Sequence, residues 1–186
     1  MWGVCNENAD TDERLAFMTG LATLARETDP NRWVTAACLI NRENFTIEDR
    51  LAEQLDVIGI NEYFGWYEPE LNLLNQLMEN SSPSRPVYIS ETGADAVAGY
   101  KGKEGKLFSE EHQKHVVTTQ IEVVSKVSYI CGIFPWLLYD FRTERRQTSV
   151  QQGWNKKGFI DKDKTTRKSV FDSVRVLYAK ILNRPL

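Results

Sequence analysis

Short apolar runs alternate with amphipathic segments along the whole chain, and this alternation constrains the fold more than any other feature. The apolar runs, each predicted to be a strand, are residues 1–5, 33–40, 56–60, 86–90 and 129–141. The amphipathic segments, each predicted to be a helix, are residues 12–27, 47–55, 68–79, 109–127 and 169–182. Near-continuous apolar strands separated by helices are typical of a parallel sheet covered on both faces. The sequence therefore predicts an α/β fold, with either a doubly wound sheet or a (β/α)8 barrel.

Two observations favour the barrel. No G-x-G-x-x-G or P-loop pattern follows any predicted strand, so the main sequence evidence for a nucleotide-binding doubly wound sheet is missing. A complete TIM barrel needs about 200–250 residues, whereas this chain has 186. We therefore expect an incomplete (β/α)8 TIM barrel, in which residues 1–186 provide about the last five βα units.

Composition excludes several classes of protein. Hydrophobic residues make up 41% of the chain and charged residues 26%, which is close to the globular average and argues against disorder. No apolar stretch approaches the roughly 18–20 residues of a membrane-spanning helix, so no membrane partner is expected. A net charge of −3 excludes a globally basic nucleic-acid binder.

The cysteines and the start of the chain bear on its location. Cys5, Cys38 and Cys131 are an odd number and sit in apolar runs, so they are predicted to be free, buried thiols in a reducing compartment. The chain does not begin with a basic segment followed by an apolar run, so no signal peptide is predicted. We therefore expect a cytoplasmic protein.

Polar and aromatic side chains gather where the predicted strands end. They are Asn6, Glu7, Asn61, Tyr63, Trp66, Tyr67, Glu91, Trp136 and Asp140. In a barrel, the carboxyl ends of the strands open on one face, where active sites are built. Two glutamates on different strand ends could divide the acid/base and nucleophile roles of glycoside hydrolysis, with aromatic rings stacking on the sugar. The alternative is that these glutamates are ordinary solvated loop residues.

Four segments of the chain resemble the motifs of one enzyme family. They are residues 2–7 (WGVCNE), 61–67 (NEYFGWY), 89–101 (ISETGADAVAGYK) and 155–169 (NKKGFIDKDKTTRKS). Their order and spacing resemble the C-terminal part of the catalytic barrel of glycoside hydrolase family 2, and they are most similar to its β-glucuronidase branch. In that family, β-sandwich domains and the first barrel strands come before this part. The resemblance therefore implies that these are absent from residues 1–186.

The resemblance also implies a retaining β-glycosidase that works by double displacement and needs no metal or other cofactor. By motif position, Glu7 is the general acid/base, Glu91 is the nucleophile and Asn6 binds the 2-hydroxyl of the sugar. The aromatic side chains implied in substrate binding are Tyr63 near the nucleophile, Tyr67 at the rim of the sugar and Trp136 under its ring.

Asn155 and Lys157 match the pair that recognises the sugar carboxylate in the family, so the resemblance implies that the partner is a glucuronide. An ammonium and an amide can both bond a carboxylate, and a neutral hexose offers them no charge. Residues 142–168 carry nine basic and three acidic residues, which suits an anionic sugar. Most of these lysines, such as Lys162 and Lys164, are expected only to solvate a loop. Few aromatic residues interleave with them, so no nucleic-acid partner is expected.

Departures from the family pattern leave the sugar and the activity open. The family commonly has tyrosine directly after the nucleophile, where this chain has Thr92, and residues 149–154 lack an arginine often found in carboxylate-binding relatives. A β-galacturonide or a β-galactoside is therefore an alternative substrate. The alternative function is a non-catalytic half-barrel that self-associates or only binds sugar. An incomplete barrel has open sheet edges, so a homo-oligomer or a missing N-terminal portion is the expected protein partner.

Other polar residues are expected to be structural. His112 and His115 lie three apart on one predicted helix without a third ligand nearby, so we expect a solvated helix face rather than a metal site. Asp56 and Asp140 border strands. Asp95 follows Glu91 in a loop, which it is expected to hold by hydrogen bonds.

Overall fold

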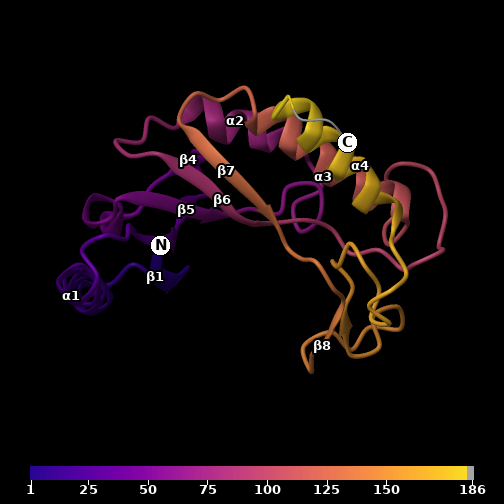
Figure 1. The fold of residues 1–186 in the computed structure, drawn as a ribbon, viewed down its shortest axis with the longest axis horizontal. Helices are drawn as coiled ribbons and strands as arrows, with labels where there is room; N and C mark the ends of the chain where they lie inside the picture. Colours follow the sequence, from indigo (N-terminus) through magenta and orange to yellow (C-terminus); the bar gives the residue numbers. More distant parts are fainter. Residues whose placement is uncertain (184–186) are drawn as a thin grey trace. The chain divides into compact units, whose positions relative to one another are not determined.

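The computed structural model describes residues 1–183 as two compact units (Figure 1). Unit 1 comprises Met1–Glu62, Asn72–Glu91 and Lys126–Phe134, and unit 2 comprises Tyr63–Leu71, Thr92–Ser125 and the described residues from Pro135 onward. Residues 184–186, the end of the barrel portion predicted over 1–186, lie outside the described residues. Within residues 1–183, no helix has both the length and the apolar character needed to span a bilayer.

A five-stranded sheet forms the centre of unit 1. Its strands are β1 (Trp2–Asn6), β2 (Val34–Cys38), β5 (Val57–Asn61), β6 (Val87–Thr92) and β7 (Ile130–Pro135), in that spatial order. Strand β1 pairs in parallel with β2, β2 with β5, and β5 with β6. The order in the sheet follows the order in the chain, as in a barrel, whereas a doubly wound sheet reverses its order at a switch point. The arrangement therefore confirms the barrel alternative.

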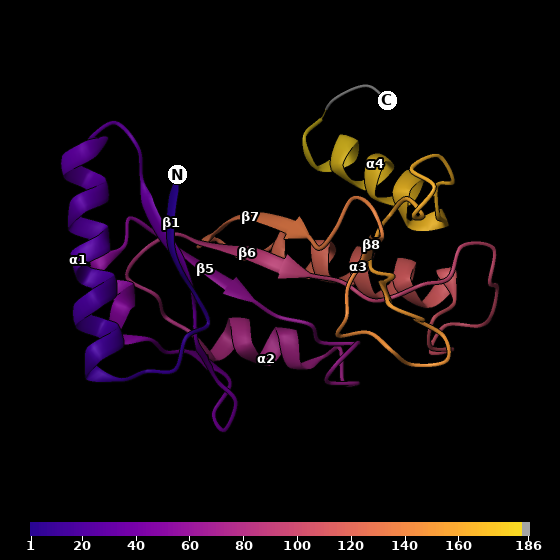
Figure 2. The ribbon, with the colours of Figure 1, turned by 90° about the horizontal axis from the view of Figure 1, so that it is seen from below.

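The connections of unit 1 differ in part from the predicted helices. They are α1 (Asp12–Thr28), the hairpin β3 (Ile40–Asn41) and β4 (Thr46–Ile47), the 3₁₀-helix η1 (Arg50–Gln54) and α2 (Leu73–Asn80). Helix α1 packs against β1, β2 and η1 (Figure 2). The short helix predicted over residues 47–55 is the 3₁₀-helix η1, which begins at Arg50, because Ile47 belongs to strand β4. Helix α2 begins at Leu73, later than predicted, and Glu68 belongs instead to a turn in which its carbonyl oxygen accepts the N–H of Gly65.

A buried ion pair fixes the chain between β2 and η1. Arg14 Nη1 and Nη2 donate to the two carboxylate oxygens of Asp49 at 2.6 and 2.7 Å. Asp49 also accepts from the backbone N–H groups of Leu39 and Leu51. Burial acts to raise the pKa of Asp49, but these hydrogen bonds outweigh it and hold the pKa below its usual value. The carboxylate is therefore ionised and anchors α1 to the loop before η1.

Unit 2 contains two long helices and an irregular segment. Its elements are α3 (Glu110–Val124), the two-stranded sheet of β8 (Phe141–Arg142) and β9 (Trp154–Asn155), and α4 (Ser169–Ile181), with α3 and α4 side by side (Figure 1). The predicted strand over residues 129–141 is too long, because β7 ends at Pro135. Pro135 has no N–H to donate to the neighbouring strand, and the N–H of Trp136 donates to Thr92 O, at the end of β6, at 2.7 Å.

A second buried ion pair joins the start of α4 to the segment before β8. Lys168 Nζ donates to Asp140 Oδ1 at 2.8 Å and to Oδ2 at 3.0 Å, and both residues are buried. Burial raises the pKa of Asp140 to about 6, and the attraction of Lys168 offsets only part of this effect. Burial likewise lowers the pKa of Lys168. These contacts support the structural role predicted for Asp140.

Two sequence-based expectations about exposure are wrong. His112 was expected on a solvated helix face, yet it is only 7% exposed and its ring lies 6.2 Å from that of Trp66. Cys131 is exposed on β7, whereas Cys38 is buried as predicted, and all three cysteines are free. His115 is half-buried, with Nδ1 3.6 Å from Glu104. Within residues 1–183, no three His, Cys, Asp or Glu side chains form a group that could hold a metal ion.

The burial of His112 predicts a loss of stability in mild acid. Burial lowers the pKa of His112 in the folded protein, whereas the unfolded value is about 6.5. The neutral form therefore stabilises the fold above about pH 6.5, and this stabilisation is lost as the pH falls toward the folded pKa, with a slope of at most about 1.4 kcal/mol per pH unit. Urea unfolding at pH 7.5 and 5.5 should show a smaller decrease in the free energy of unfolding for His112→Gln than for wild type.

Thr119→Ala is the control, since Thr119 lies on the same helix and carries no titratable group. Its decrease between the two pH values should equal that of wild type. Asp140 acts in the opposite direction between about pH 6 and its unfolded pKa, but it is present in all three proteins and its effect cancels. Identical pH dependence in His112→Gln and wild type would contradict the prediction.

Candidate functional site

The two predicted catalytic glutamates lie at the carboxyl end of the sheet in unit 1. Glu7 directly follows β1, is exposed, and donates its backbone N–H to Ala37 O at 2.9 Å. Its φ of 51° is in the left-handed region, which costs a non-glycine residue of the order of 1 kcal/mol. Glu91 is the last residue but one of β6 and is half-buried. Strands β2 and β5 lie between the strands that carry the two carboxylates.

Asn61 links the strands that carry these glutamates. Its Nδ2 donates to Asn6 Oδ1 at 3.0 Å, and its Oδ1 accepts from Ser90 Oγ at 2.7 Å. Asn61 is 2% exposed and lies at the end of β5, so it is a fixed support. The contact orients the Asn6 amide so that its oxygen faces the sheet. Sequence reasoning placed Asn61 at this edge but did not predict its role, which depends on the spatial order of β1, β2, β5 and β6.

In unit 2, Lys157 is the centre of a buried cluster. Its Nζ lies 2.7 Å from Asp95 Oδ1, and the two side chains are 1% and 0% exposed. Asp95 Oδ2 accepts from Gln151 Nε2 at 2.5 Å and from the backbone N–H of Lys156 at 3.4 Å. Further hydrogen bonds offset part of the cost of burying the two charges, and Asp95 Oδ2 accepts two of them. Asp95 thus holds its loop, as predicted, and also neutralises Lys157.

Aromatic rings and an amide complete this cluster. Lys157 Nζ lies 4.8–5.5 Å from the ring centroids of Tyr63, Trp66 and Tyr67, at distances typical of cation–π contacts. It also donates to the hydroxyl oxygen of Tyr67 at 3.1 Å. Asn155 is buried on β9, and its Oδ1 accepts the backbone N–H of Lys157 at 3.1 Å, which leaves Nδ2 as a donor.

Trp136 follows β7 and is 36% exposed. Its ring lies 6.2 Å from that of Phe141 in an edge-to-face arrangement. An indole fixed in this way can offer a face to a sugar. The predicted site residues therefore form two groups: Asn6, Glu7 and Glu91 in unit 1, and Tyr63, Tyr67, Trp136, Asn155 and Lys157 in unit 2. Within the second group, Tyr63, Tyr67 and Asn155 gather around Lys157.

Residues 1–183 match the family model described as "Glycosyl hydrolases family 2, TIM barrel domain". The chain belongs to glycoside hydrolase family 2. The sheet of unit 1 is therefore part of an incomplete family 2 (β/α)8 barrel, as the motifs predicted, and its strand order agrees.

Relatives within family 2 share both sequence and fold with this chain. It is 31% identical to the β-glucuronidase of Chlorocebus aethiops, over 98% of this chain and 29% of that protein. It is 30% identical to the β-glucuronidase of Paenibacillus borealis, over 88% of this chain and 28% of that protein. A crystal structure of a family 2 β-galacturonidase from Eisenbergiella tayi bound to galacturonate superposes with a TM-score of 0.82 and 25% identity, over 96% of this chain and 33% of that one.

Another similar structure is a complex with an aryl glucuronide. The β-glucuronidase of Bifidobacterium dentium, in complex with coumarin-3-O-glucuronide, superposes with a TM-score of 0.80 and 29% identity, over 96% of this chain and 30% of that chain. The chain thus spans less than a third of the length of the curated relatives that it matches.

Proposed function

We propose that this chain carries the catalytic residues of a retaining β-glycoside hydrolase of the β-glucuronidase type. The observation that carries the proposal is the placement of Glu7 and Glu91 at the carboxyl ends of two strands of one parallel sheet. This edge is where TIM-barrel enzymes build their active sites. The β-glucuronidase relatives support the choice of reaction.

The mechanism needs two carboxyl groups about 5–5.5 Å apart, one protonated and one ionised. In the first step, the Glu91 carboxylate attacks the anomeric carbon while Glu7 transfers its proton to the leaving oxygen, which yields the aglycone and a glycosyl–Glu91 ester. In the second step, the Glu7 carboxylate takes a proton from water as the water oxygen attacks the anomeric carbon. The ester bond to Glu91 breaks, and the sugar leaves with its original β configuration. Asn6 would bond the 2-hydroxyl through its Nδ2.

The substrate class follows from the cluster around Lys157. Its ammonium and the Asn155 amide are buried donors, and a carboxylate at C6 of the sugar is the acceptor that gains most from them. Relatives with glucuronide- and galacturonate-bound structures support a uronic acid. The two sugars differ only at the 4-hydroxyl, and we propose the glucuronide because the curated relatives are β-glucuronidases.

The test is hydrolysis of 4-nitrophenyl β-D-glucuronide by the purified 186-residue chain. The matching galacturonide and galactoside serve as comparison substrates. We expect the highest kcat/KM on the glucuronide, and proton NMR of the early reaction should show the β anomer of free glucuronate first. A folded chain that hydrolyses none of the three glycosides, or one that releases the α anomer first, would overturn the proposal in favour of a sugar-binding or structural half-barrel.

Lys157→Ala should change the selectivity of the enzyme. Removing the ammonium should lower kcat/KM on the glucuronide by roughly 10–100-fold more than on the galactoside, since a hydrogen bond to a charged group contributes about 1.5–3 kcal/mol. The ratio of the two kcat/KM values is measured in one preparation, so any change in the folded fraction cancels. Lys162→Ala is the control, because Lys162 is exposed. An equal loss on both substrates would reject the role of Lys157 in carboxylate recognition.

A further inference from the structure

Two cations of unit 2 meet at one atom, the hydroxyl oxygen of Tyr67. Arg146 donates a hydrogen bond to this oxygen through Nη2, and Lys157 Nζ donates to it at 3.1 Å. The guanidinium carbon of Arg146 also lies 5.6 Å from the centroid of the Tyr67 ring. Arg146 belongs to the segment between β8 and β9, so it reaches Tyr67 from outside the family-like motifs. Two like charges on one neutral oxygen repel each other unless an anion compensates them.

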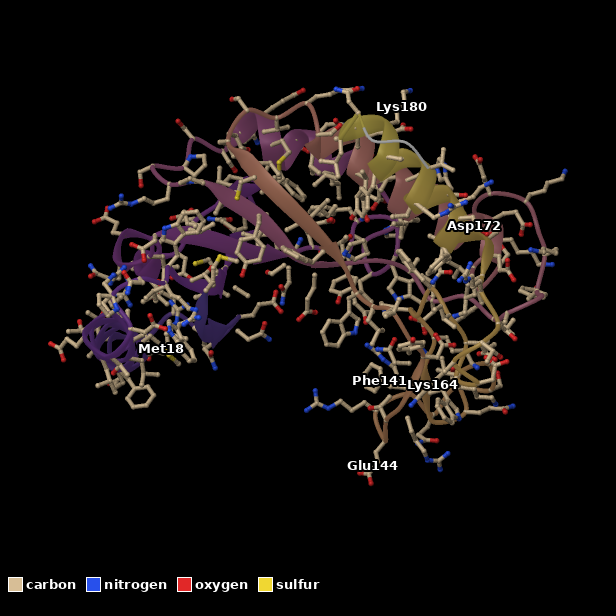
Figure 3. All side chains as sticks on the ribbon, in the orientation of Figure 1. Met18, Phe141, Glu144, Lys164, Asp172 and Lys180 are labelled. Carbon is tan, nitrogen blue, oxygen red and sulfur yellow. The ribbon has the colours of Figure 1, made fainter. Side chains whose placement is uncertain are left out.

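The protein itself compensates only one of these charges. Asp95 pairs with Lys157, and both side chains are buried. In the described part of the chain, residues 1–183, no carboxylate forms an ion pair with Arg146. Glu144, the acidic residue nearest to it in sequence, points outward from the segment that follows β8 (Figure 3). The group of Arg146, Lys157, Asp95 and Tyr67 therefore has one net positive charge. Tyr67 is 50% exposed, so a ligand can reach this charge.

The hydroxyl proton of Tyr67 also needs a partner. A phenol oxygen accepts through its lone pairs and donates one O–H. Since both cations donate to the Tyr67 oxygen, its O–H is directed to a third group. A carboxylate can accept from the O–H with one oxygen and from the planar guanidinium with the other. A neutral sugar hydroxyl can accept a hydrogen bond from only one of these donors, and it leaves the net charge uncompensated.

We propose that Arg146 supplies the net positive charge that binds the carboxylate of the uronic acid. Lys157, which Asp95 neutralises, then orients this carboxylate together with the Tyr67 hydroxyl. The inference rests on the proposed function and deepens it, because it makes Arg146 a residue that determines specificity for a charged sugar. The sequence expectation assigned this recognition to Asn155 and Lys157 alone. Residues 149–154 contain no arginine, and Arg146 reaches the cluster from just before them.

The test compares Arg146→Gln with Arg145→Gln in the full 186-residue chain. Arg145 is the adjacent residue with an exposed side chain, and its backbone N–H donates to Thr143 Oγ1. Binding of D-glucuronate and of D-glucose is measured by ligand-observed NMR. Arg146→Gln should weaken D-glucuronate binding by about tenfold or more and leave D-glucose binding unchanged, because only the first ligand has a carboxylate. Arg145→Gln should bind both as wild type does. Arg146→Lys keeps the positive charge but loses the planar, two-donor guanidinium. Its affinity for D-glucuronate should therefore lie between those of Arg146→Gln and wild type.

The outcomes separate this inference from the proposed function. Arg146→Gln binding D-glucuronate like wild type, an equal loss for both sugars, or no D-glucuronate binding by wild type would each overturn the inference. If wild type hydrolyses no aryl glycoside but binds D-glucuronate through Arg146, the proposed catalysis fails and the inference stands. If wild type and Arg146→Gln hydrolyse 4-nitrophenyl β-D-glucuronide equally well, the proposed function stands and the inference fails.

Discussion

Replacing Glu91 with alanine should lower kcat on 4-nitrophenyl β-D-glucuronide by about four orders of magnitude or more. The methyl group of alanine cannot form the glycosyl ester, so the two-step route is closed and only the effects of substrate binding are left. The loss should be equally severe for good and poor leaving groups, because the bond to the anomeric carbon is missing in every case. Initial rates for a series of aryl β-D-glucuronides measure this.

Sodium azide gives the prediction a chemical signature. In Glu91→Ala, the space left by the carboxylate admits azide, which attacks the anomeric carbon from that face and yields the α-glucuronosyl azide. Glu7→Ala is the matched variant. It keeps the nucleophile and loses the proton donor, so its rate should depend strongly on the leaving group, and azide should yield the β product. If Glu91→Ala yields the β azide, or Glu7→Ala yields the α azide, the two roles are assigned wrongly.

The sheet was predictable because its strands are short and apolar on both faces. Strand β5 is buried at every position, and the run over residues 56–60 located it within one residue. The same criterion failed at β7, where apolar residues continue past Pro135 into a segment that bonds to Thr92 at the end of β6 and then to Lys157 in an irregular segment. The hairpin of β3 and β4 was missed because its two-residue strands are too short to show a period.

The site residues were predictable only where a motif contains them. Glu7, Glu91 and Lys157 stand in segments that resemble family 2, and the structure places the two glutamates at one sheet edge. Arg146 and Gln151 lie in a segment without such a motif, so their contacts with Tyr67 and Asp95 depend on the path of a loop. A basic residue excess over residues 142–168 was the only signal, and it does not distinguish Arg146 from its neighbours.

Asp95→Asn should be among the most destabilising single substitutions in unit 2. It keeps the shape of the side chain but removes the negative charge 2.7 Å from Lys157 Nζ, and the ammonium is left buried without a counter-charge. Breaking a buried ion pair on one side costs about 3–5 kcal/mol. Urea unfolding at pH 7.5 should show this loss in the free energy of unfolding. Arg50→Gln, which breaks the exposed pairs with Asp10 and Asp12, should leave the free energy nearly unchanged.

Removing both charges separates an electrostatic cost from a packing cost. In the double variant Asp95→Asn/Lys157→Met, no charge is buried, and the unbranched methionine fills most of the volume of the lysine stem. We expect the double variant to be more stable than Asp95→Asn alone by about 1 kcal/mol or more, which gives a coupling energy outside the range of independent sites. Additive losses would show that Asp95 stabilises unit 2 mainly through Gln151 and the Lys156 backbone. In that case the charge of Lys157 would remain available to a ligand. Restored stability in the double variant would instead show that Asp95 neutralises Lys157 in the folded protein.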